Sequence, residues 1–197
     1  IGAEGYQFIN PYLLDPNNNN IMYLAAGKFI WRNDDLSGIA LSNQWDSIST
    51  NWLKFSDSMS VSTESVSALA ISKTPANRLY YGTDEGTVYR VDNANVGSPT
   101  RVDITGSTFP ANGFTSCIAV NPHNADQVLV VFSNYSVYSL FYSTDGGTTW
   151  ARVAGNLEQN ANGTGNGPSL RWASILPVSD GTVYLVGTST GLYSTDT

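Results

Sequence analysis

Two adjacent carboxylates are the residues of this chain whose types come closest to catalytic chemistry. Asp84 and Glu85 lie in the segment Gly82-Thr83-Asp84-Glu85-Gly86, between two short apolar runs. Hydrolysis of a glycosidic bond uses two carboxyl groups that flank the bond, about 5 to 10 Å apart. Because neighbouring residues can diverge across a turn, Asp84 and Glu85 also fit the solvated tip of a hairpin. We therefore assign no catalytic residue and keep these two acids as the candidates.

The single cysteine and the single histidine offer no second chemistry. Cys117 lies in the apolar run from Phe114 to Val120 and excludes an internal disulfide or a cysteine-based zinc site. We expect its thiol to be buried. His123 lies in a polar turn, without a serine or cysteine at the spacing of a known nucleophile motif. The sequence therefore predicts no metal site and no cofactor.

The composition is acidic and polar, with a sizeable apolar fraction. Of the 197 residues, 41% are hydrophobic, 12% aromatic and 13% charged, which suits an all-β domain. Nine basic residues against sixteen acidic ones give a formal net charge of −7. Nucleic acid and anionic membrane surfaces are unsuitable partners, because both attract basic proteins. No apolar run in the sequence approaches the length that membrane insertion requires.

The elements that would position these side chains are organised around one turn, Ser143-Thr144-Asp145-Gly146-Gly147-Thr148-Thr149-Trp150. Asp145 can accept hydrogen bonds from nearby backbone N–H groups, and Gly146 and Gly147 provide backbone angles with φ > 0. Trp150 opens the next segment with a large apolar face. The pattern predicts a tight turn between two antiparallel strands.

This octet resembles the Asp-box, S-x-D-x-G-x-T-W, of the propellers of sialidases, sortilin-type receptors and xyloglucan-hydrolysing glycosidases. Its defining positions are filled by Ser143, Asp145, Gly147, Thr149 and Trp150. The resemblance implies that the octet joins the third and fourth strands of a propeller blade, on the face opposite the ligand site. It also implies a structural role for Asp145 and burial of Trp150 between adjacent blades.

Internal repeats extend the resemblance over the whole chain. Four segments share an apolar strand, a small residue, a short turn and an aromatic strand, and they align at Gly27, Gly82, Phe132 and Gly187. Their spacing of about 50 residues is close to the length of known propeller blades. The sequence therefore predicts an all-β fold, a β-propeller of four-stranded antiparallel blades. About four blades are expected, at residues 1–55, 56–106, 107–157 and 158–197.

Within each blade we expect the strands to follow one another from the propeller axis outward. The expected strands are residues 6–15, 21–27, 29–33 and 45–49 in the first blade; 66–72, 78–83, 87–92 and 101–105 in the second; 114–121, 127–133, 137–142 and 149–154 in the third; and 171–178, 182–187 and 191–194 in the fourth.

The fourth blade is expected to be incomplete. Ser194-Thr195-Asp196-Thr197 starts another Asp-box, and the outer strand that would follow it is missing. The chain also begins at Ile1 without a methionine. We therefore expect a trimmed or excised product that forms part of a larger propeller, in preference to a closed four-bladed ring. The open edge is expected to pair with another chain or with the rest of the parent protein.

The ligand-binding face follows from the connectivity. The octet lies on one face of the propeller, so the turns between second and third strands and the connections between blades lie on the other, where propellers commonly bind ligands. We expect Asn134 and Tyr135 on this second face, and one of Arg171 and Trp172 pointing to the central channel. These four residues are the ligand-binding candidates. Long polar loops on a rigid scaffold support this placement.

Two functions remain open. In the xyloglucan-hydrolysing family a Thr-Asp-x-Gly-Gly segment in an early blade carries a catalytic aspartate, whereas the first blade here reads Ala25-Ala26-Gly27-Lys28-Phe29. The Arg-Ile-Pro segment of sialidases is absent as well. The first interpretation is a noncatalytic binding or scaffold module, secreted or at the cell surface, with a glycan or protein ligand. The alternative is a fragment of a sialidase-like or xyloglucanase-like glycoside hydrolase.

Overall fold

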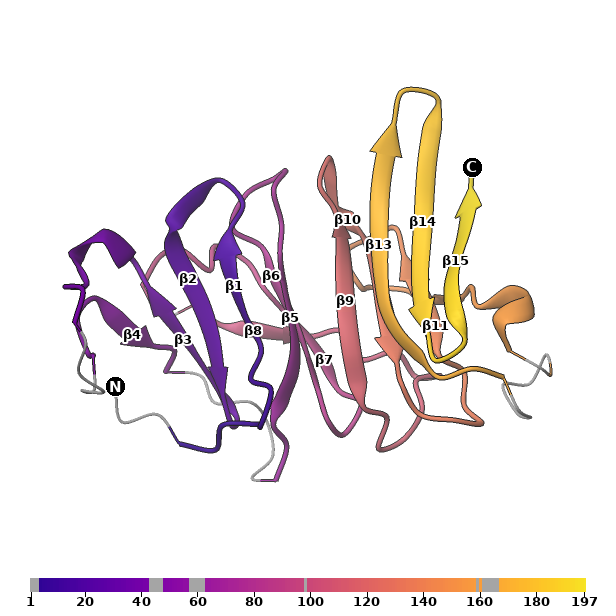
Figure 1. Ribbon diagram of the computed structural model, residues 1–197, viewed down its shortest axis with the longest axis horizontal. Helices are drawn as coiled ribbons and strands as arrows, with labels where there is room; N and C mark the ends of the chain where they lie inside the picture. The colour runs from indigo at the N-terminus through magenta and orange to yellow at the C-terminus, as the bar shows by residue number, and fades with distance from the viewer. Residues whose placement is uncertain (1–3, 43–47, 57–62, 98, 159, 161–166) are drawn as a thin grey trace.

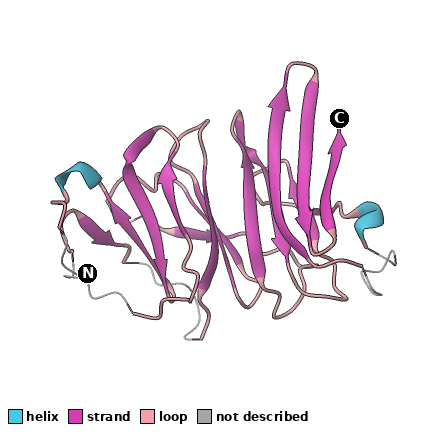
Figure 2. Cartoon of the chain, in the orientation of Figure 1, coloured by secondary structure: helices cyan, strands magenta, loops and turns pink. Residues whose placement is uncertain are grey.

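The computed structural model describes residues 4–42, 48–56, 63–97, 99–158, 160 and 167–197. These residues form four antiparallel sheets, which we call blades 1 to 4 in chain order (Figure 1, Figure 2). Blade 1 consists of β1 (Tyr12–Asp15), β2 (Asn18–Ala26), β3 (Phe29–Asn33) and β4 (Trp52–Lys54). Blade 2 consists of β5 (Val66–Ile71), β6 (Leu79–Thr83), β7 (Val88–Val91) and β8 (Arg101–Asp103).

The second half of the chain repeats this arrangement. Blade 3 consists of β9 (Thr115–Asn121), β10 (Asn124–Phe132), β11 (Leu140–Ser143) and β12 (Ala151–Arg152). Blade 4 consists of β13 (Leu170–Val178), β14 (Gly181–Thr188) and β15 (Gly191–Asp196). Two short 3-10 helices, η1 (Leu36–Gly38) and η2 (Gly155–Leu157), follow β3 and β12.

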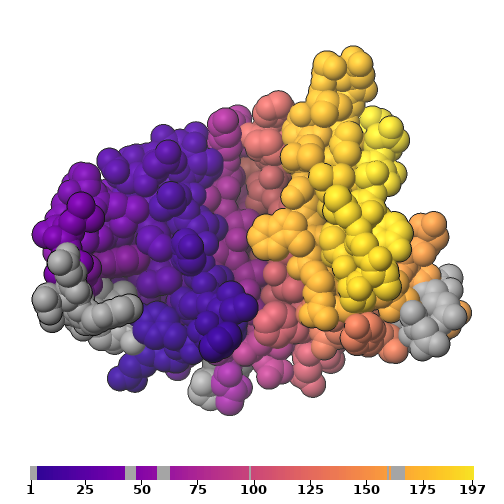
Figure 3. All heavy atoms as spheres, in the orientation of Figure 1, coloured from indigo at the N-terminus to yellow at the C-terminus, as the bar shows by residue number. Residues whose placement is uncertain are grey.

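The four blades form an open arc. In each blade the strands pair in sequence order, and the first strands β1, β5, β9 and β13 lie side by side along the arc (Figure 1). Blade 1 lies at one end and blade 4 at the other, so β1 and β15 are far apart. In the space-filling view the tip of the β13–β14 hairpin projects beyond the other blades (Figure 3). The expected all-β propeller architecture of antiparallel blades is confirmed.

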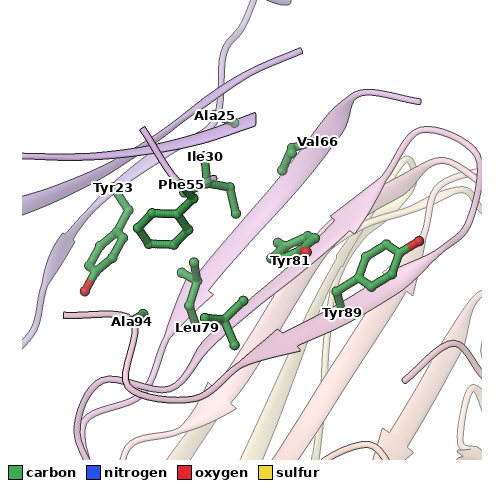
Figure 4. Close-up of a cluster of buried hydrophobic side chains, with 10 residues drawn as sticks. Tyr23, Ala25, Ile30, Phe55, Val66, Leu79, Tyr81, Tyr89 and Ala94 are labelled. Carbon is green, nitrogen blue, oxygen red and sulfur yellow. The ribbon is translucent and has the colours of Figure 1, made fainter. Parts of the chain in front are cut away.

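Apolar side chains between neighbouring blades hold the arc together. Between blades 1 and 2, Tyr23, Ile30 and Phe55 pack against Leu79 and Tyr81 (Figure 4). Every residue of β6 is buried, because this central strand is covered on both sides. This double coverage explains why the inner and central strands are nearly continuous apolar runs in the sequence.

The two further cores repeat this pattern. Between blades 2 and 3 the buried side chains include Tyr80, Ile104, Phe132 and Phe141. Between blades 3 and 4 they include Cys117, Leu129, Leu140, Leu170 and Val186. The expected burial of the Cys117 thiol is confirmed, since the residue is 2% exposed and lies against Ala173 of the next blade.

Equivalent positions can be identified from two recurring features. A bulge interrupts the first strand of blades 2, 3 and 4 at Ser67, Ser116 and Arg171. A hydrogen bond then recurs just after the fourth strand of blades 1 to 3. The backbone N–H groups of Phe55, Ile104 and Val153 donate to the third strand of their own blade, to the carbonyl oxygens of Ile30, Val88 and Leu140, at 2.9, 3.0 and 3.0 Å. Phe55, Ile104 and Val153 are thus equivalent.

The structure corrects the expected strands of blade 1. β1 begins at Tyr12 instead of residue 6, because Pro11 has no N–H to donate, although its carbonyl oxygen still accepts from Ala25 at 3.0 Å. The outer strand expected at residues 45–49 falls mostly on residues 43–47, which lie outside the described residues. The outer strand is instead β4, which pairs with β3 through Trp31 and Lys54.

The register of blade 4 corrects a second expectation. Ser143 pairs with Val128 in blade 3, and the residue equivalent to Val128 in blade 4 is Tyr184, which pairs with Thr195. Thr195 therefore takes the place of Ser143, and the Asp-box expected to begin at Ser194 is displaced by one residue. Because side chains alternate between the faces of a strand, this displacement prevents Asp196 from taking the role of Asp145.

Candidate functional site

The candidate site lies where the turns between second and third strands gather, together with the residues that lead into each first strand. We call this surface the loop face. Its turns are residues 27–28, 84–87, 133–139 and 189–190. Successive strands of each blade are antiparallel, so these turns lie at the opposite strand ends from the turn Ser143–Trp150.

Asp84, the first candidate acid, is half-buried in a reciprocal pair of hydrogen bonds. Its carboxylate oxygen Oδ1 accepts from the backbone N–H of Ser65 at 2.8 Å, and its own N–H donates to the Ser65 carbonyl oxygen at 3.0 Å. Ser65 directly precedes the first strand of blade 2. Asp84 therefore ties the turn of its blade to the segment that enters the same blade.

The other blades make the same connection without a carboxylate. The side-chain oxygen of Asn134 accepts from the N–H of Phe114 at 2.6 Å in blade 3. The hydroxyl of Ser189 accepts from the N–H of Ser169 at 3.1 Å in blade 4, and the Ser189 N–H donates back at 2.9 Å. An amide, one residue farther along the turn, and a hydroxyl thus make the contact that the carboxylate makes in blade 2, so the contact requires a hydrogen-bond acceptor and not a negative charge.

Glu85 and Glu64 complete the acids of this turn. Glu85 is exposed at the tip, and its N–H donates to the Thr83 hydroxyl at 3.3 Å. Glu64, which the sequence reasoning missed, is only 7% exposed and accepts from the Thr87 hydroxyl at 2.9 Å. Glu64 belongs to a polar loop with no periodic pattern, so no sequence signal marked it. It braces the same turn from the loop that precedes β5.

Glu158 is a second acid that the sequence reasoning did not single out. Its carboxylate accepts from the backbone N–H of Ser139 at 2.6 Å, at the end of the turn of blade 3. Burial raises the pKa of Glu158 above its ordinary value, while the hydrogen bond from Ser139 and the charge of Arg152 act in the opposite direction. Glu64, Asp84 and Glu158 therefore each serve as acceptors that hold a loop or turn in place.

Tyr135 is presented to solvent by a turn that these contacts fix. The side chain is 59% exposed, next to Asn134, whose hydrogen bond to Phe114 anchors the turn. Phe114 is itself 38% exposed. The loop face thus offers aromatic side chains on a rigid base, which suits binding by stacking more than proton transfer.

Arg171 and Trp172 are both exposed, and the expectation that one of them points to the central channel stays a prediction. The bulge lies between Leu170, which pairs with Thr188, and Trp172, which pairs with Gly187, so strict alternation is lost at Arg171. Trp172 is 62% exposed.

Trp172 is equivalent to Cys117 of blade 3, because both residues directly follow the bulge of their first strand. The Cys117 side chain packs against the following blade. Trp172 therefore lies on the face of blade 4 that is turned away from blade 3, at the open end of the arc. It does not belong to the turn that carries Tyr135.

The turn Ser143–Trp150 lies on the opposite face and is held by Asp145. The carboxylate of Asp145 accepts from the Thr149 hydroxyl at 2.6 Å, the Thr149 N–H at 2.9 Å and the Ser143 hydroxyl at 2.8 Å. These bonds, led by those from Thr149, lower the pKa of Asp145 to about 2. Gly147 has φ of +92°, and a Cβ atom there would lie 2.5 Å from the Ile104 side chain. Both conditions require glycine.

Charged residues connect blades 2 and 3 on the same face. Arg78 of blade 2 forms ion pairs with Asp92 of its own blade, at 2.6 Å, and with Asp126 of blade 3. Arg90 donates to the carbonyl oxygen of Gly146 at 2.9 Å. These contacts engage both arginines in interactions within blade 2 and between blades 2 and 3.

Within the described part of the chain, no group of three or more His, Cys, Asp or Glu residues is placed to hold a metal ion. Across the same residues, no helix has the length and apolar character that crossing a membrane requires.

Comparison with known proteins finds a similar sequence in a xyloglucanase and similar folds in several solved structures. No family model matches the chain. An oligoxyloglucan-reducing end-specific xyloglucanase of Emericella nidulans is 26% identical over 209 aligned residues, which cover 98% of this chain and 23% of that enzyme. The chain thus spans less than a quarter of the length of this curated relative.

Solved structures show the same fold. A GH74 enzyme of Niastella koreensis superposes with a TM-score of 0.64 and 16% identity, over 98% of this chain and 29% of that one. The extracellular domain of a one-component system from B. thetaiotaomicron superposes with a TM-score of 0.57 and 14% identity, over 93% of this chain and 21% of that one. The expected similarity to the xyloglucan-hydrolysing propellers is confirmed.

Proposed function

We propose that this chain forms part of an extracellular propeller that binds a polysaccharide on its loop face and does not itself carry the acid pair for hydrolysis. The observation that carries this proposal is the structural use of Asp84. Its carboxylate holds the Ser65 N–H, and Asn134 and Ser189 fill the same role in the next blades. A general acid or nucleophile would instead be directed at a bound substrate.

The aromatic side chains of the loop face favour a glycan ligand. Tyr135 and Phe114 are both exposed. Tyr135 lies on the turn of blade 3, and Phe114 lies on the segment that the neighbouring Asn134 anchors to this turn. The flat apolar faces of sugar rings stack on such side chains. The similarity to a xyloglucanase over nearly the whole chain makes xyloglucan, a β-linked glucan with xylose branches, the first ligand to test.

An extracellular location agrees with the same observations. The chain is similar both to a xyloglucanase and to an extracellular domain. Its net charge of −7 disfavours nucleic acid, which agrees with a glycan or protein as the partner.

The second candidate function is a part of a glycoside hydrolase whose catalytic acids lie partly outside these residues. The observation that favours it is the alignment over 98% of this chain with a xyloglucanase of which it covers only 23%. In this case the loop face would contribute substrate contacts, while the acid pair would require residues of other blades.

Isothermal titration calorimetry of the chain with xyloglucan oligosaccharides tests the proposal. We expect saturable binding that Tyr135→Ala weakens by about tenfold, a loss of about 1.4 kcal/mol. Val102→Ala, on the outer strand of blade 2 and 45% exposed, is the matched control and should bind like the unmodified chain. Release of reducing ends that Asp84→Asn abolishes would contradict the noncatalytic proposal and favour the alternative.

A further inference from the structure

Four acids lie where blades 2 and 3 meet the loop face, and their carboxylates differ in what they contact. Glu64, Asp84 and Glu158 each accept a hydrogen bond from a neighbouring loop or turn, at 2.9, 2.8 and 2.6 Å. Glu85 is exposed at the tip of its turn, and in the described part of the chain its carboxylate makes no hydrogen bond or ion pair. Of these four acids, Glu85 is therefore the one whose carboxylate is available to a ligand.

The turn that carries Glu85 packs against the loop that enters blade 3. Gly86 has φ of +89°, and a Cβ atom there would lie 2.8 Å from the carbonyl oxygen of Pro110 and 3.0 Å from the backbone nitrogen of Gly113. Glu85 directly precedes Gly86, and Phe114 directly follows Gly113. Glu85 and the exposed Phe114 therefore lie on backbone segments of two blades that are in contact.

Phe114 is held by the turn that carries Tyr135. The Phe114 N–H donates to the side-chain oxygen of Asn134 at 2.6 Å, and the Ser133 N–H donates to the Phe114 carbonyl oxygen at 3.1 Å. Blade 4 fixes the same turn, because the hydroxyl of the buried Ser169 donates to the Ser133 carbonyl oxygen at 2.6 Å. These contacts position both aromatic residues before a ligand arrives, which lowers the entropic cost of binding.

A free carboxylate near two exposed aromatic residues indicates the chemistry of the ligand. Aromatic rings stack on the apolar faces of sugars, and an ionised carboxylate accepts strong hydrogen bonds from hydroxyl groups. The same carboxylate repels a sugar that carries a carboxylate of its own, and the net charge of −7 adds to this repulsion. The arrangement therefore favours a neutral glycan over an acidic one.

We propose that Glu85 is a specificity-determining residue of the loop face, which selects a neutral glycan over a glycan that contains uronic acids. Phe114 and Tyr135 stack on the sugar rings, and the Glu85 carboxylate accepts hydrogen bonds from the glycan hydroxyls. A uronic acid at the same position places two negative charges next to each other. This inference rests on the proposed binding of a polysaccharide at the loop face.

Isothermal titration calorimetry at low salt, with xyloglucan oligosaccharides and oligogalacturonides as probes, tests this proposal. The unmodified chain should bind the neutral probe and not the acidic one. Glu85→Ala should weaken xyloglucan binding about tenfold, because hydrogen bonds to a charged acceptor are lost. Glu85→Lys should in addition bind oligogalacturonides, and added salt should reduce this gain, since the attraction is electrostatic.

Asp103 provides the matched control. Asp103→Ala and Asp103→Lys make the same changes of charge on the outer strand of blade 2, and both variants should keep the preference of the unmodified chain. Circular dichroism verifies that all variants are folded.

The outcomes separate this inference from the proposed function. Glu85 variants that bind both probes like their Asp103 counterparts would overturn the role of Glu85, while weaker xyloglucan binding by Tyr135→Ala would still support the loop face as a glycan site. Tighter binding of cationic chitosan oligosaccharides than of xyloglucan would overturn the assignment to a neutral glycan. Absence of xyloglucan binding by the unmodified chain would contradict the proposed function, and this inference with it.

Discussion

The indole N–H of Trp150 in blade 3 donates to the carbonyl oxygen of Ile104 in blade 2, at 2.8 Å. This hydrogen bond crosses the boundary between two sheets that share no ladder hydrogen bonds. The Trp150 ring meanwhile packs in the apolar core between the same blades, next to Phe109. A single side chain therefore joins two blades by both polar and apolar contact, which makes its removal a direct test of how the propeller is held together.

Trp150 is half-buried, which is less than the expected burial between blades, so Trp150→Ala should lower the free energy of unfolding by about 3 kcal/mol, the low end for truncating an aromatic side chain. Trp150→Phe keeps a ring but loses the N–H donor, so a loss of about 1 kcal/mol is expected. Urea denaturation followed by circular dichroism measures both. An alanine variant as stable as the unmodified chain would show that this contact does not connect the blades.

Asp145→Asn should remove a pH dependence of stability. The pKa of Asp145 is lowered to about 2 in the folded chain, from an ordinary value of 3.8. The charged carboxylate therefore stabilises the fold above pH 4, and this contribution is lost as the pH falls through about 2. We expect the difference in melting temperature between the unmodified chain and Asp145→Asn to be largest at pH 5 to 7 and to shrink toward pH 2. A constant difference across this range would contradict the role of Asp145.

Glu158→Gln should act in the opposite direction. Burial raises the pKa of Glu158, so its contribution to stability is present at low pH and is lost as the pH rises through the raised pKa. The glutamine retains an oxygen that can accept from the Ser139 N–H. The variant should therefore gain melting temperature relative to the unmodified chain at pH 7 and lose this advantage at pH 3. Equal melting curves at both values would count against burial of the charge.

Asp84→Asn should leave stability nearly unchanged, because an amide oxygen already performs this role at Asn134. Asp84→Ala, in contrast, removes the acceptor of the Ser65 N–H and should cost about 1 kcal/mol. Chemical denaturation of both variants provides the measurement. If the carboxylate served catalysis alone, Asp84→Asn and Asp84→Ala would have the same stability. An asparagine variant as unstable as the alanine variant would therefore contradict the acceptor role.

The local parts of the fold could be read from residue types. The octet from Ser143 to Trp150 combines residues that only a tight turn requires together, and Asp145, Gly146 and Gly147 adopt the expected roles. The repeated apolar runs predicted four blades, because each run is buried between two neighbours and must be apolar on both sides. Blade 1 was harder, since the residues before β4 have no clear alternation.

The contacts between distant segments needed the tertiary structure. Asp84 and Ser65 are 19 residues apart, so nothing in the sequence indicated that this carboxylate serves a backbone N–H. The same holds for Glu158 and Ser139.

The register between neighbouring strands could not be predicted from the sequence pattern either. A shift of one residue exchanges the two faces of a strand without changing its composition, and so the displacement at Thr195 became visible only in the pairing of β14 with β15. Turn chemistry and apolar periodicity depend on residues that are close together in the sequence, so both can be predicted from it. The partners of a polar side chain depend on which strands the folded chain brings together.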